Sequence, residues 1–333
     1  MYPSRLPDTS ARRGSGPLPA TLVVAVLGLL LALVPWSAHA GTDESPAPTP
    51  TPVREVVTTP VRVATYNVCS RHCPRLHSWD RRAARIAAEI ARVRPDVVTI
   101  QEAGTRSTRR LLTDRLARRG YLAAVGAAGQ YTYHRSATVS TRDEAGSRLD
   151  HLLIWTTKRA GRRGRAPVQV FRHLRTGGRV VVVNYHLPAY DTRARDRARR
   201  DEYQDVEARL APLLRSLPGV PVVKSGDFNS YVQPNTSRFD SHRHRARVWP
   251  LVRGDGFVDA ARTAASTSRA RLNTIIRAPG DRRRFGPFRH LDHVFVPRGT
   301  TVSRWTLVLR AGGYREQSSD HRLTYADLVL AGR

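Results

Sequence analysis

The sequence predicts an α/β fold, because short β-branched runs alternate along the chain with segments of helical periodicity. Four runs, at residues 61–64, 97–100, 180–183 and 220–223, have the length and composition of buried strands. Helical spacing is clearest at residues 80–93, where apolar side chains recur on one face and arginines lie opposite. Strands and helices in this alternation are typical of a layered α/β protein.

The remaining element predictions extend the same alternation. Helices are expected at residues 105–118 and 196–217, the second with a heavily charged outer face. Residues 294–296 form a further apolar run, and residues 301–309 are predicted as strand, followed by a Gly-Gly turn. We expect these elements to share one core.

The N-terminal end predicts export. Three arginines precede an uncharged stretch at 14–37 with an apolar centre at 22–34, and an Ala-His-Ala tripeptide ends at Ala40. This is the pattern of a secretory signal peptide, so residues 1–40 are expected to be removed and the protein to be secreted and extracellular. An uncleaved membrane anchor is the alternative, although the apolar centre is short for a membrane span.

The rest of the chain predicts a linker and one domain. Residues 41–60 are rich in Pro and Thr and lack apolar periodicity, which is typical of an extended linker. Residues 61–331 are enough for one large core, and no second linker interrupts them.

Polar residues follow most of the predicted strands. The segments concerned are Tyr66-Asn67, Gln101-Glu102, Asn184-Tyr185-His186, Gly226-Asp227-Phe228-Asn229 and Ser319-Asp320-His321. A sixth pair, Asp292-His293, leads into the run at 294–296. Side chains at strand ends project from a rigid sheet edge, where open sheets bind ligands. Each segment alone has an ordinary structural explanation, such as a turn or a helix cap, but the set together predicts a site.

The residue types suit hydrolysis of a phosphate ester with a hard divalent cation. Mg²⁺ takes one or two carboxylates plus waters and phosphate oxygens, so Glu102 with Asp320 or Asp227 would suffice. Histidine carries protons near neutral pH, and a nearby carboxylate fixes its tautomer, so Asp292 with His321 is predicted as an oriented acid/base pair.

These segments, in this order, resemble the endonuclease/exonuclease/phosphatase superfamily, which includes deoxyribonucleases, AP endonucleases, neutral sphingomyelinases and inositol phosphatases. The resemblance covers residues 61–330, and its most specific parts are residues 226–229 and 319–321. It implies a four-layered α/β sandwich, with two packed mixed β-sheets flanked by helices. It also implies that Glu102 ligates Mg²⁺, that Asn67 orients the metal end of the site, and that Asp320 ligates or supports the metal. Mn²⁺ and Ca²⁺ stay open as alternative cations.

The resemblance implies catalytic roles as well. Asp227 would position or deprotonate the attacking water, and Asn229 and His186 would hydrogen-bond the scissile phosphate. His321, held by Asp292, would be the second proton-transfer group. Which histidine gives and which takes the proton stays open.

His186 resembles the histidine of deoxyribonuclease-like and sphingomyelinase-like members, which makes the DNA-repair branch the weaker expectation. Deoxyribonucleases pair that histidine with a glutamate from an earlier strand. Here Asp143, Glu144 and Asp150 are the candidates for that partner.

Cys69 and Cys73 are the two cysteines of the chain. In an exported protein, a Cys-x-x-x-Cys pair is expected to form a local disulfide rather than a metal site. Two unlinked thiols are the alternative. Because the pair follows Asn67, we expect it to shape the rim of the site.

The formal net charge of +29 predicts a polyanionic partner. Residues 1–40 contain three arginines and one aspartate, so the mature chain keeps +27. Arg243, Arg245, Arg284 and Arg289 lie in arginine-rich segments near two of the polar motifs and are predicted to bind substrate phosphates. Such segments are also often plain solvated loops.

Together these observations predict a secreted, Mg²⁺-dependent phosphodiesterase, a nonspecific endonuclease acting on extracellular DNA as a monomer. One alternative is a sphingomyelinase-like or phospholipase-like phosphodiesterase, or a phosphatase, which would share the catalytic core. A second alternative is a catalytically silent polyanion-binding protein. Anionic lipid therefore stays open beside nucleic acid as the partner.

Overall fold

The computed structural model describes residues 57–71, 73, 75–157, 163–190, 192–231, 247–276 and 289–332. The chain divides into two compact units, Met1–Pro52 and Val53–Arg333, and all described residues belong to the second. The predicted signal peptide and most of the linker therefore lie outside the described residues. Among the described residues, the helices lack the length and apolar character of a membrane span.

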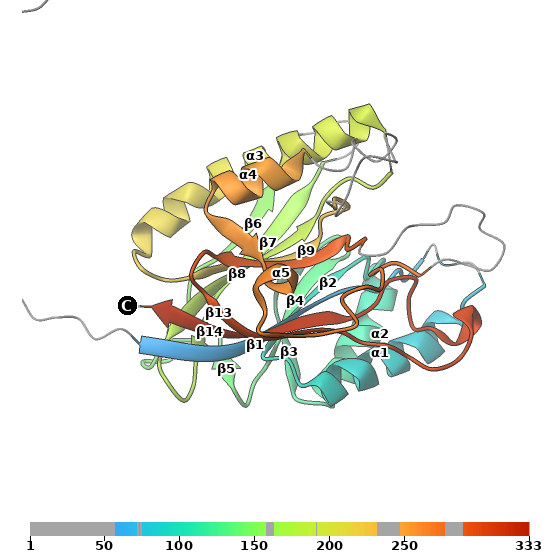
Figure 1. The fold of residues 1–333 in the computed structure, drawn as a ribbon. Coiled ribbons are helices and arrows are strands. Elements are labelled where there is room, and N and C mark those ends of the chain that lie inside the picture. The colour runs from blue at the N-terminus through green and yellow to red at the C-terminus, as the bar shows by residue number, and fades with distance from the viewer. Residues whose placement is uncertain are drawn as a thin grey trace, which may run out of the picture. The chain divides into compact units, whose positions relative to one another are not determined.

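Two mixed β-sheets of seven strands each form the centre of this unit (Figure 1). Sheet A has the order β11 (Ser266–Ser268), β13 (Thr301–Leu307), β14 (Thr324–Gly332), β1 (Val57–Asn67), β2 (Val97–Gln101), β4 (Gln130–Arg135) and β3 (Tyr121–Ala127). Sheet B has the order β10 (Phe257–Asp259), β12 (Asp292–Pro297), β9 (Val222–Asp227), β8 (Arg179–His186), β7 (Arg165–His173) and β5 (Val139–Ser140), with β6 (His151–Trp155) also paired to β7.

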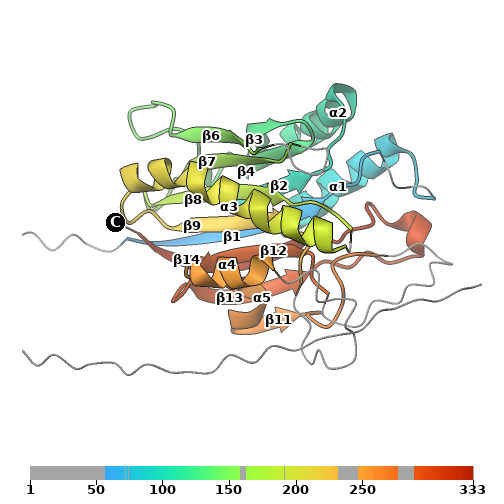
Figure 2. The same ribbon diagram turned by 90° about the horizontal axis from the view of Figure 1, so that it is seen from above.

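Helices cover the outer faces of both sheets, as Figures 1 and 2 show. Helices α1 (Trp79–Val93) and α2 (Arg106–Ala117) pack on sheet A, and α3 (Arg193–Ser216) and α4 (Val248–Gly254) pack on sheet B. Two short helices, α5 (Ala260–Thr263) and the 3₁₀ helix η3 (Tyr314–Glu316), lie near the C-terminal half. The predicted four-layered α/β sandwich is therefore confirmed.

Three apolar layers hold the sandwich together. One lies between the sheets and includes Val63, Val182 and Trp305. The second joins sheet B to α3 and α4, and the third joins sheet A to α1 and α2. The predicted apolar face of residues 80–93 is buried in this third layer, since Ile86 and Ile90 are fully buried.

Candidate active site

The predicted polar residues meet at one edge of the sandwich. β1 runs parallel to β2, and β8 runs parallel to β9. Four of the polar residues lie at the carboxyl ends of these strands: Asn67, Glu102, His186 and Asp227. β12 is antiparallel to β9, which sets Asp292 opposite Asp227. β14 is antiparallel to β1, so the segment just before it returns to the same edge. The residues brought together are Asn67, Glu102, His186, Asp227, Asp292 and His321.

Asn67 joins the two carboxylates of this group. Its Nδ2 donates hydrogen bonds to Glu102 Oε1 and Asp227 Oδ2, both at 3.0 Å. Its Oδ1 accepts a hydrogen bond from the Cys69 backbone N–H at 3.1 Å. Asn67 thus orients both carboxylates as a hydrogen-bond donor.

Backbone strain accompanies the site. Glu102 and Asn229 have left-handed φ values of +56° and +47°. Asn tolerates this region, but for Glu it costs about 1–3 kcal/mol, and such strain concentrates at functional sites. At Gly226, φ is +151° and a Cβ atom would lie 2.0 Å from the Tyr185 carbonyl oxygen, so only glycine fits before Asp227.

Asp227 is buried between two imidazoles. Its Oδ2 lies 3.9 Å from the Nε2 atoms of both His186 and His321. Its Oδ1 accepts the Asn229 backbone N–H at 2.8 Å. Burial, together with the nearby Asp292 carboxylate, raises the pKa of Asp227 to about 7, although His321 and the donor from Asn67 oppose that shift. This carboxyl can therefore change protonation state near neutral pH.

His321 and Asp292 form a buried pair. His321 Nδ1 lies 2.8 Å from Asp292 Oδ2. Burial alone would lower the pKa of His321, but the Asp292 carboxylate and its hydrogen bond, with Asp227 beyond, raise that pKa well above the ordinary 6.5. Nδ1 therefore carries the proton that Asp292 accepts, and Nε2 faces Asp227.

The structure sets two carboxylates beside His186 Nε2, those of Glu102 and Asp227, and neither is one of the three candidates from the sequence. His186 Nε2 lies 3.5 Å from Glu102 Oε1. Glu144 instead pairs with Arg172 at 3.2 Å and lies 3.9 Å from Arg179, which begins β8 at the end opposite His186. Asp143 accepts the Ser147 backbone N–H in a local turn, and Asp150 is exposed.

Asp320 lies beside the disulfide between Cys69 and Cys73. One carboxylate oxygen of Asp320 and the two sulfur atoms are all within 4.8 Å of one another. Ser319 connects this corner to the rest of the site, because its hydroxyl donates to the Asn67 carbonyl at 2.7 Å. The disulfide thus lies at the rim, beside the segment that carries His321.

Arg82 is a site residue that sequence reasoning missed. It belongs to the helix face predicted to carry exposed arginines, yet it is buried. Its guanidinium donates to five carbonyl oxygens, those of Val68, Cys69, Ser70, His77 and Ser318, at 3.0–3.3 Å. Arg82 therefore fastens the loop after Asn67 to the segment before His321. Nothing in the sequence distinguishes Arg82 from the other arginines of this helix, so its burial could not be predicted.

The predicted substrate-binding arginines are mostly not described. Arg243, Arg245 and Arg284 lie outside the described residues. Arg289 is only 2 % exposed, and its guanidinium lies over the Tyr231 ring at 5.3 Å from the centroid. Arg289 therefore packs against Tyr231, and its predicted contact with a substrate phosphate stays a prediction.

The acidic residues fit a divalent cation in two places. Asp227, Asp292 and His321 each offer a ligand atom within 4.8 Å of the others, and Asp292 Oδ1 is buried with no donor among the described residues. This group is closed and leaves little room for the waters that Mg²⁺ retains. Glu102, with 35 % of its side chain exposed, offers a carboxylate that water can reach and is the better anchor for a hydrated hard cation.

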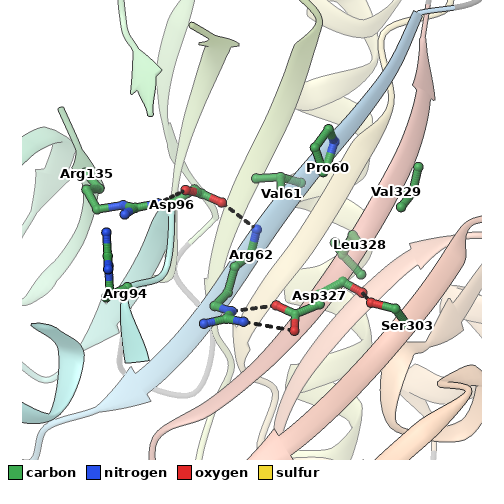
Figure 3. Close-up of a pocket in the computed structure, with 10 residues that line it drawn as sticks. All are labelled: Pro60, Val61, Arg62, Arg94, Asp96, Arg135, Ser303, Asp327, Leu328 and Val329. Carbon is green, nitrogen blue, oxygen red and sulfur yellow. Dashed lines mark hydrogen bonds and ion pairs between the residues drawn. The ribbon is translucent and has the colours of Figure 1, made fainter. Parts of the chain in front are cut away.

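A separate cavity of about 510 Å³ lies beside β1 and β14 (Figure 3). Arg62 donates to both oxygens of Asp327, at 2.5 and 3.0 Å. Asp96 accepts the Arg62 backbone N–H at 2.7 Å and a guanidinium N–H of Arg135 at 2.8 Å. The acidic residues that line this cavity are thus paired with arginines, and none of the candidate catalytic residues lines it.

Solved structures share this fold. An endonuclease/exonuclease/phosphatase family protein from Bacteroides thetaiotaomicron is 17% identical over 83% of this chain and 97% of its own, with a TM-score of 0.64. A mannosyl-6-phosphatase from the same organism is 17% identical over 81% of this chain and 100% of its own, with a TM-score of 0.61. Truncated TDP2 from Caenorhabditis elegans is 20% identical over 81% of this chain and 97% of its own, with a TM-score of 0.56.

Sequence comparison identifies the family. No curated protein sequence matches this chain. The model of the Endonuclease/Exonuclease/phosphatase family matches residues 64–321, a range that contains every residue of the site described above. The chain therefore belongs to the endonuclease/exonuclease/phosphatase family.

Proposed function

We propose that this family phosphoesterase is an exported, Mg²⁺-dependent phosphodiesterase that cleaves DNA internally without sequence preference. The observation that carries the proposal is the continuous polar network from Glu102 through Asn67 to Asp227, with an imidazole on either side of Asp227. Such a network supplies a cation anchor, a base and an acid within a few ångströms, which are the groups that phosphodiester hydrolysis needs.

Glu102 would hold the cation, which supplies charge neutralisation to the phosphate when bound, and Asp320 stays a predicted further ligand. Asp227 is the general base for the attacking water, because a pKa of about 7 lets its carboxylate accept a proton near neutral pH. His321, held by Asp292, is the acid that protonates the leaving oxygen through Nε2. His186 donates a hydrogen bond to the phosphate.

Asn229 completes the phosphate contacts. Its amide nitrogen donates one hydrogen bond to the Leu187 carbonyl at 3.1 Å, which holds the side chain in place. An amide nitrogen has two donors, so the second is available to a phosphate oxygen. A donor held in this way costs no reorganisation as negative charge develops during the reaction.

The net charge of +29 and the predicted signal peptide support DNA outside the cell as the substrate. A polyanion gains both affinity and encounter rate from such a surface, whereas a small monoester gains little.

The test is a substrate panel. Residues 41–333 would be incubated with plasmid DNA, sphingomyelin vesicles and p-nitrophenyl phosphate, each in Mg²⁺ or EDTA. We expect Mg²⁺-dependent nicking of the plasmid and at most weak turnover of the other two. Sphingomyelin or monoester turnover without nicking would contradict the proposal and assign the site to a different ester.

A further inference from the structure

Two exposed aromatic side chains in the described part of the chain each have an arginine over the ring. Trp155 and Tyr190 are 39% and 70% exposed. The guanidinium carbon lies 6.0 Å from the Trp155 ring centroid for Arg165, and 5.9 Å from the Tyr190 centroid for Arg195. A planar base can stack on the ring face opposite the guanidinium, and the guanidinium can bind a phosphate.

Tyr190 follows the active site directly. It lies four residues after His186, so the two Cα atoms are at most about 14 Å apart. The intervening segment is fastened to the catalytic strand, since the Leu187 backbone N–H donates to the Asp227 carbonyl at 2.9 Å. The Leu187 carbonyl in turn accepts the Asn229 side chain. Tyr190 thus has a fixed position relative to the catalytic residues.

The fold also holds Tyr190 in a conformation that tyrosine rarely adopts, with φ at +76°. Arg199 donates to the carbonyls of Pro188 and Tyr190, both at 2.9 Å. Arg199 and its partner Asp196 are fully buried and lie 3.2 Å apart. Arg199 thus holds the strained backbone of Tyr190, whose ring is exposed to water.

Trp155 ends β6, which pairs with β7, and β7 pairs with β8, the strand that ends at His186. Arg165, which pairs with Trp155 across β6 and β7, donates to the Ala128 carbonyl, and the neighbouring Gly129 carbonyl accepts the Ala103 backbone N–H at 2.8 Å. Ala103 directly follows Glu102, so these hydrogen bonds connect Arg165 to the segment that carries Glu102.

Strand alternation sets Trp155 on the same face as His186. Ala166 and Tyr185 point into the layer under α3. Their neighbours Arg165 and His186 therefore point to the opposite face, toward sheet A. Trp155 is directly opposite Arg165 and shares that face.

We propose that the Trp155–Arg165 and Tyr190–Arg195 pairs are stacking platforms for unpaired bases that flank the scissile phosphate. This inference rests on the proposed nuclease function and narrows it to single-stranded or locally unpaired nucleic acid. In a duplex, the base faces are occupied by neighbouring bases, so such platforms have nothing to bind. A choline headgroup is disfavoured, because the arginine on each ring repels the quaternary ammonium that an aromatic face otherwise attracts.

The test compares KM for a mixed-sequence single strand and for its blunt duplex. We expect the wild-type protein to have the lower KM for the single strand. Tyr190→Ala and Trp155→Ala should each raise that KM by about 5- to 150-fold, the range for loss of one stacked base. Tyr190→Phe and Trp155→Phe keep an aromatic ring, so KM for the single strand should stay close to the wild-type value. Leu174→Ala, an exposed apolar residue just beyond the far end of β7, is the matched control and should leave KM unchanged.

A strand with abasic residues beside the cleavage site separates stacking from general damage. For the wild-type protein, removal of those bases should raise KM by the same factor as Trp155→Ala and Tyr190→Ala combined in one variant, and that double variant should show no further loss on the abasic strand. The stacking proposal would be wrong if KM were equal for both strand forms and neither alanine substitution changed it. The proposed nuclease function would stand in that case. Absence of any nucleic-acid cleavage would instead overturn the proposed function.

Discussion

At the scale of single residues, the chemistry depends on two buried carboxylates that face each other across paired strands. Asp227 and Asp292 lie opposite each other on β9 and β12, and each has His321 within reach. Asp292 raises the pKa of both Asp227 and His321, by repelling a second negative charge and by attracting a positive one. One residue thus adjusts both the base and the acid.

Asp292→Asn should therefore change both limbs of the pH–rate profile. In the wild-type protein, kcat/KM should rise as Asp227 ionises through about pH 7 and fall as His321 loses its proton at higher pH. Removal of the Asp292 charge lowers both pKa values, so both limbs should move to lower pH, with kcat reduced about 100- to 10,000-fold. A profile that moves to higher pH would contradict these assignments.

Asp259→Asn is a matched control for that variant, because it removes the charge of the other buried His–Asp pair. His293 Nδ1 lies 2.9 Å from Asp259 Oδ2, and His293 Nε2 lies 2.8 Å from the Ser230 carbonyl. Both ring nitrogens face acceptors, so His293 is an imidazolium. This histidine does not face Asp227, so kcat of the folded protein should be retained while stability falls.

The same pair predicts a pH dependence of stability. Burial opposes both shifts, but mutual attraction raises the pKa of His293 above 6.5 and lowers that of Asp259 below 3.8. The contribution of His293 to the free energy of unfolding is complete below pH 6.5 and is lost as the pH rises through its raised pKa. The contribution of Asp259 is present above pH 3.8 and is lost as the pH falls through its lowered pKa. Urea unfolding should show Asp259→Asn less stable by about 3–5 kcal/mol at pH 5, with a smaller difference at pH 9. A difference that grows with pH would refute the imidazolium assignment.

At the scale of elements, α1 does more than cover sheet A. Through Arg82 it joins the loop after β1 to the segment before β14, and Arg82 and Ser318 are 236 residues apart in the chain. These two segments carry Asn67 and His321. The helix therefore helps to set the distance between the two halves of the site.

Arg82→Met should lower the free energy of unfolding by on the order of 3 kcal/mol, because five carbonyl oxygens lose a shared donor. Urea denaturation measures the loss, and kcat should fall with it as the loops separate. Arg92→Met, an exposed arginine on the same helix, should change stability by less than about 0.5 kcal/mol. Equal losses of stability for the two substitutions would show that Arg82 does not hold the two segments together.

The elements that sequence could predict are those whose pattern is local. The run at 97–100 became β2, and the helix expected at 196–217 spans Arg193–Ser216, because β-branching and helical periodicity are written into neighbouring residues. The polar residues at strand ends were likewise visible, since parallel pairing carries them to one edge. The burial of Arg82 and Arg289, and the Glu102–His186 contact, depend on segments far apart in sequence and leave no local signal.

At the scale of the whole molecule, charge is the dominant property. The chain has 56 Lys and Arg against 27 Asp and Glu, so the field around the enzyme favours polyanions of any sequence. The arginines at 243, 245 and 284 remain predicted phosphate contacts within this field. Affinity for nucleic acid should therefore come chiefly from phosphates, with the aromatic platforms selecting strand form.

Salt should accordingly weaken DNA binding steeply. The logarithm of the affinity for a single strand should fall linearly with the logarithm of the NaCl concentration, with a slope of about −0.7 per phosphate contact. KM measured between 50 and 200 mM NaCl checks this, with bis(p-nitrophenyl) phosphate as the small diester whose KM should change little. A KM for DNA that does not depend on salt would argue against phosphate-driven binding.

The most direct measurement is plasmid nicking by residues 41–333 in Mg²⁺ and in EDTA, beside the double variant Glu102→Gln, His321→Ala. We expect the wild-type protein to nick the plasmid in Mg²⁺ and not in EDTA, and the variant to bind DNA without nicking it. Tight DNA binding without nicking by the wild-type protein would contradict the proposed function and identify the chain as a silent polyanion-binding protein. Nicking by the double variant would show that the catalytic residues lie elsewhere.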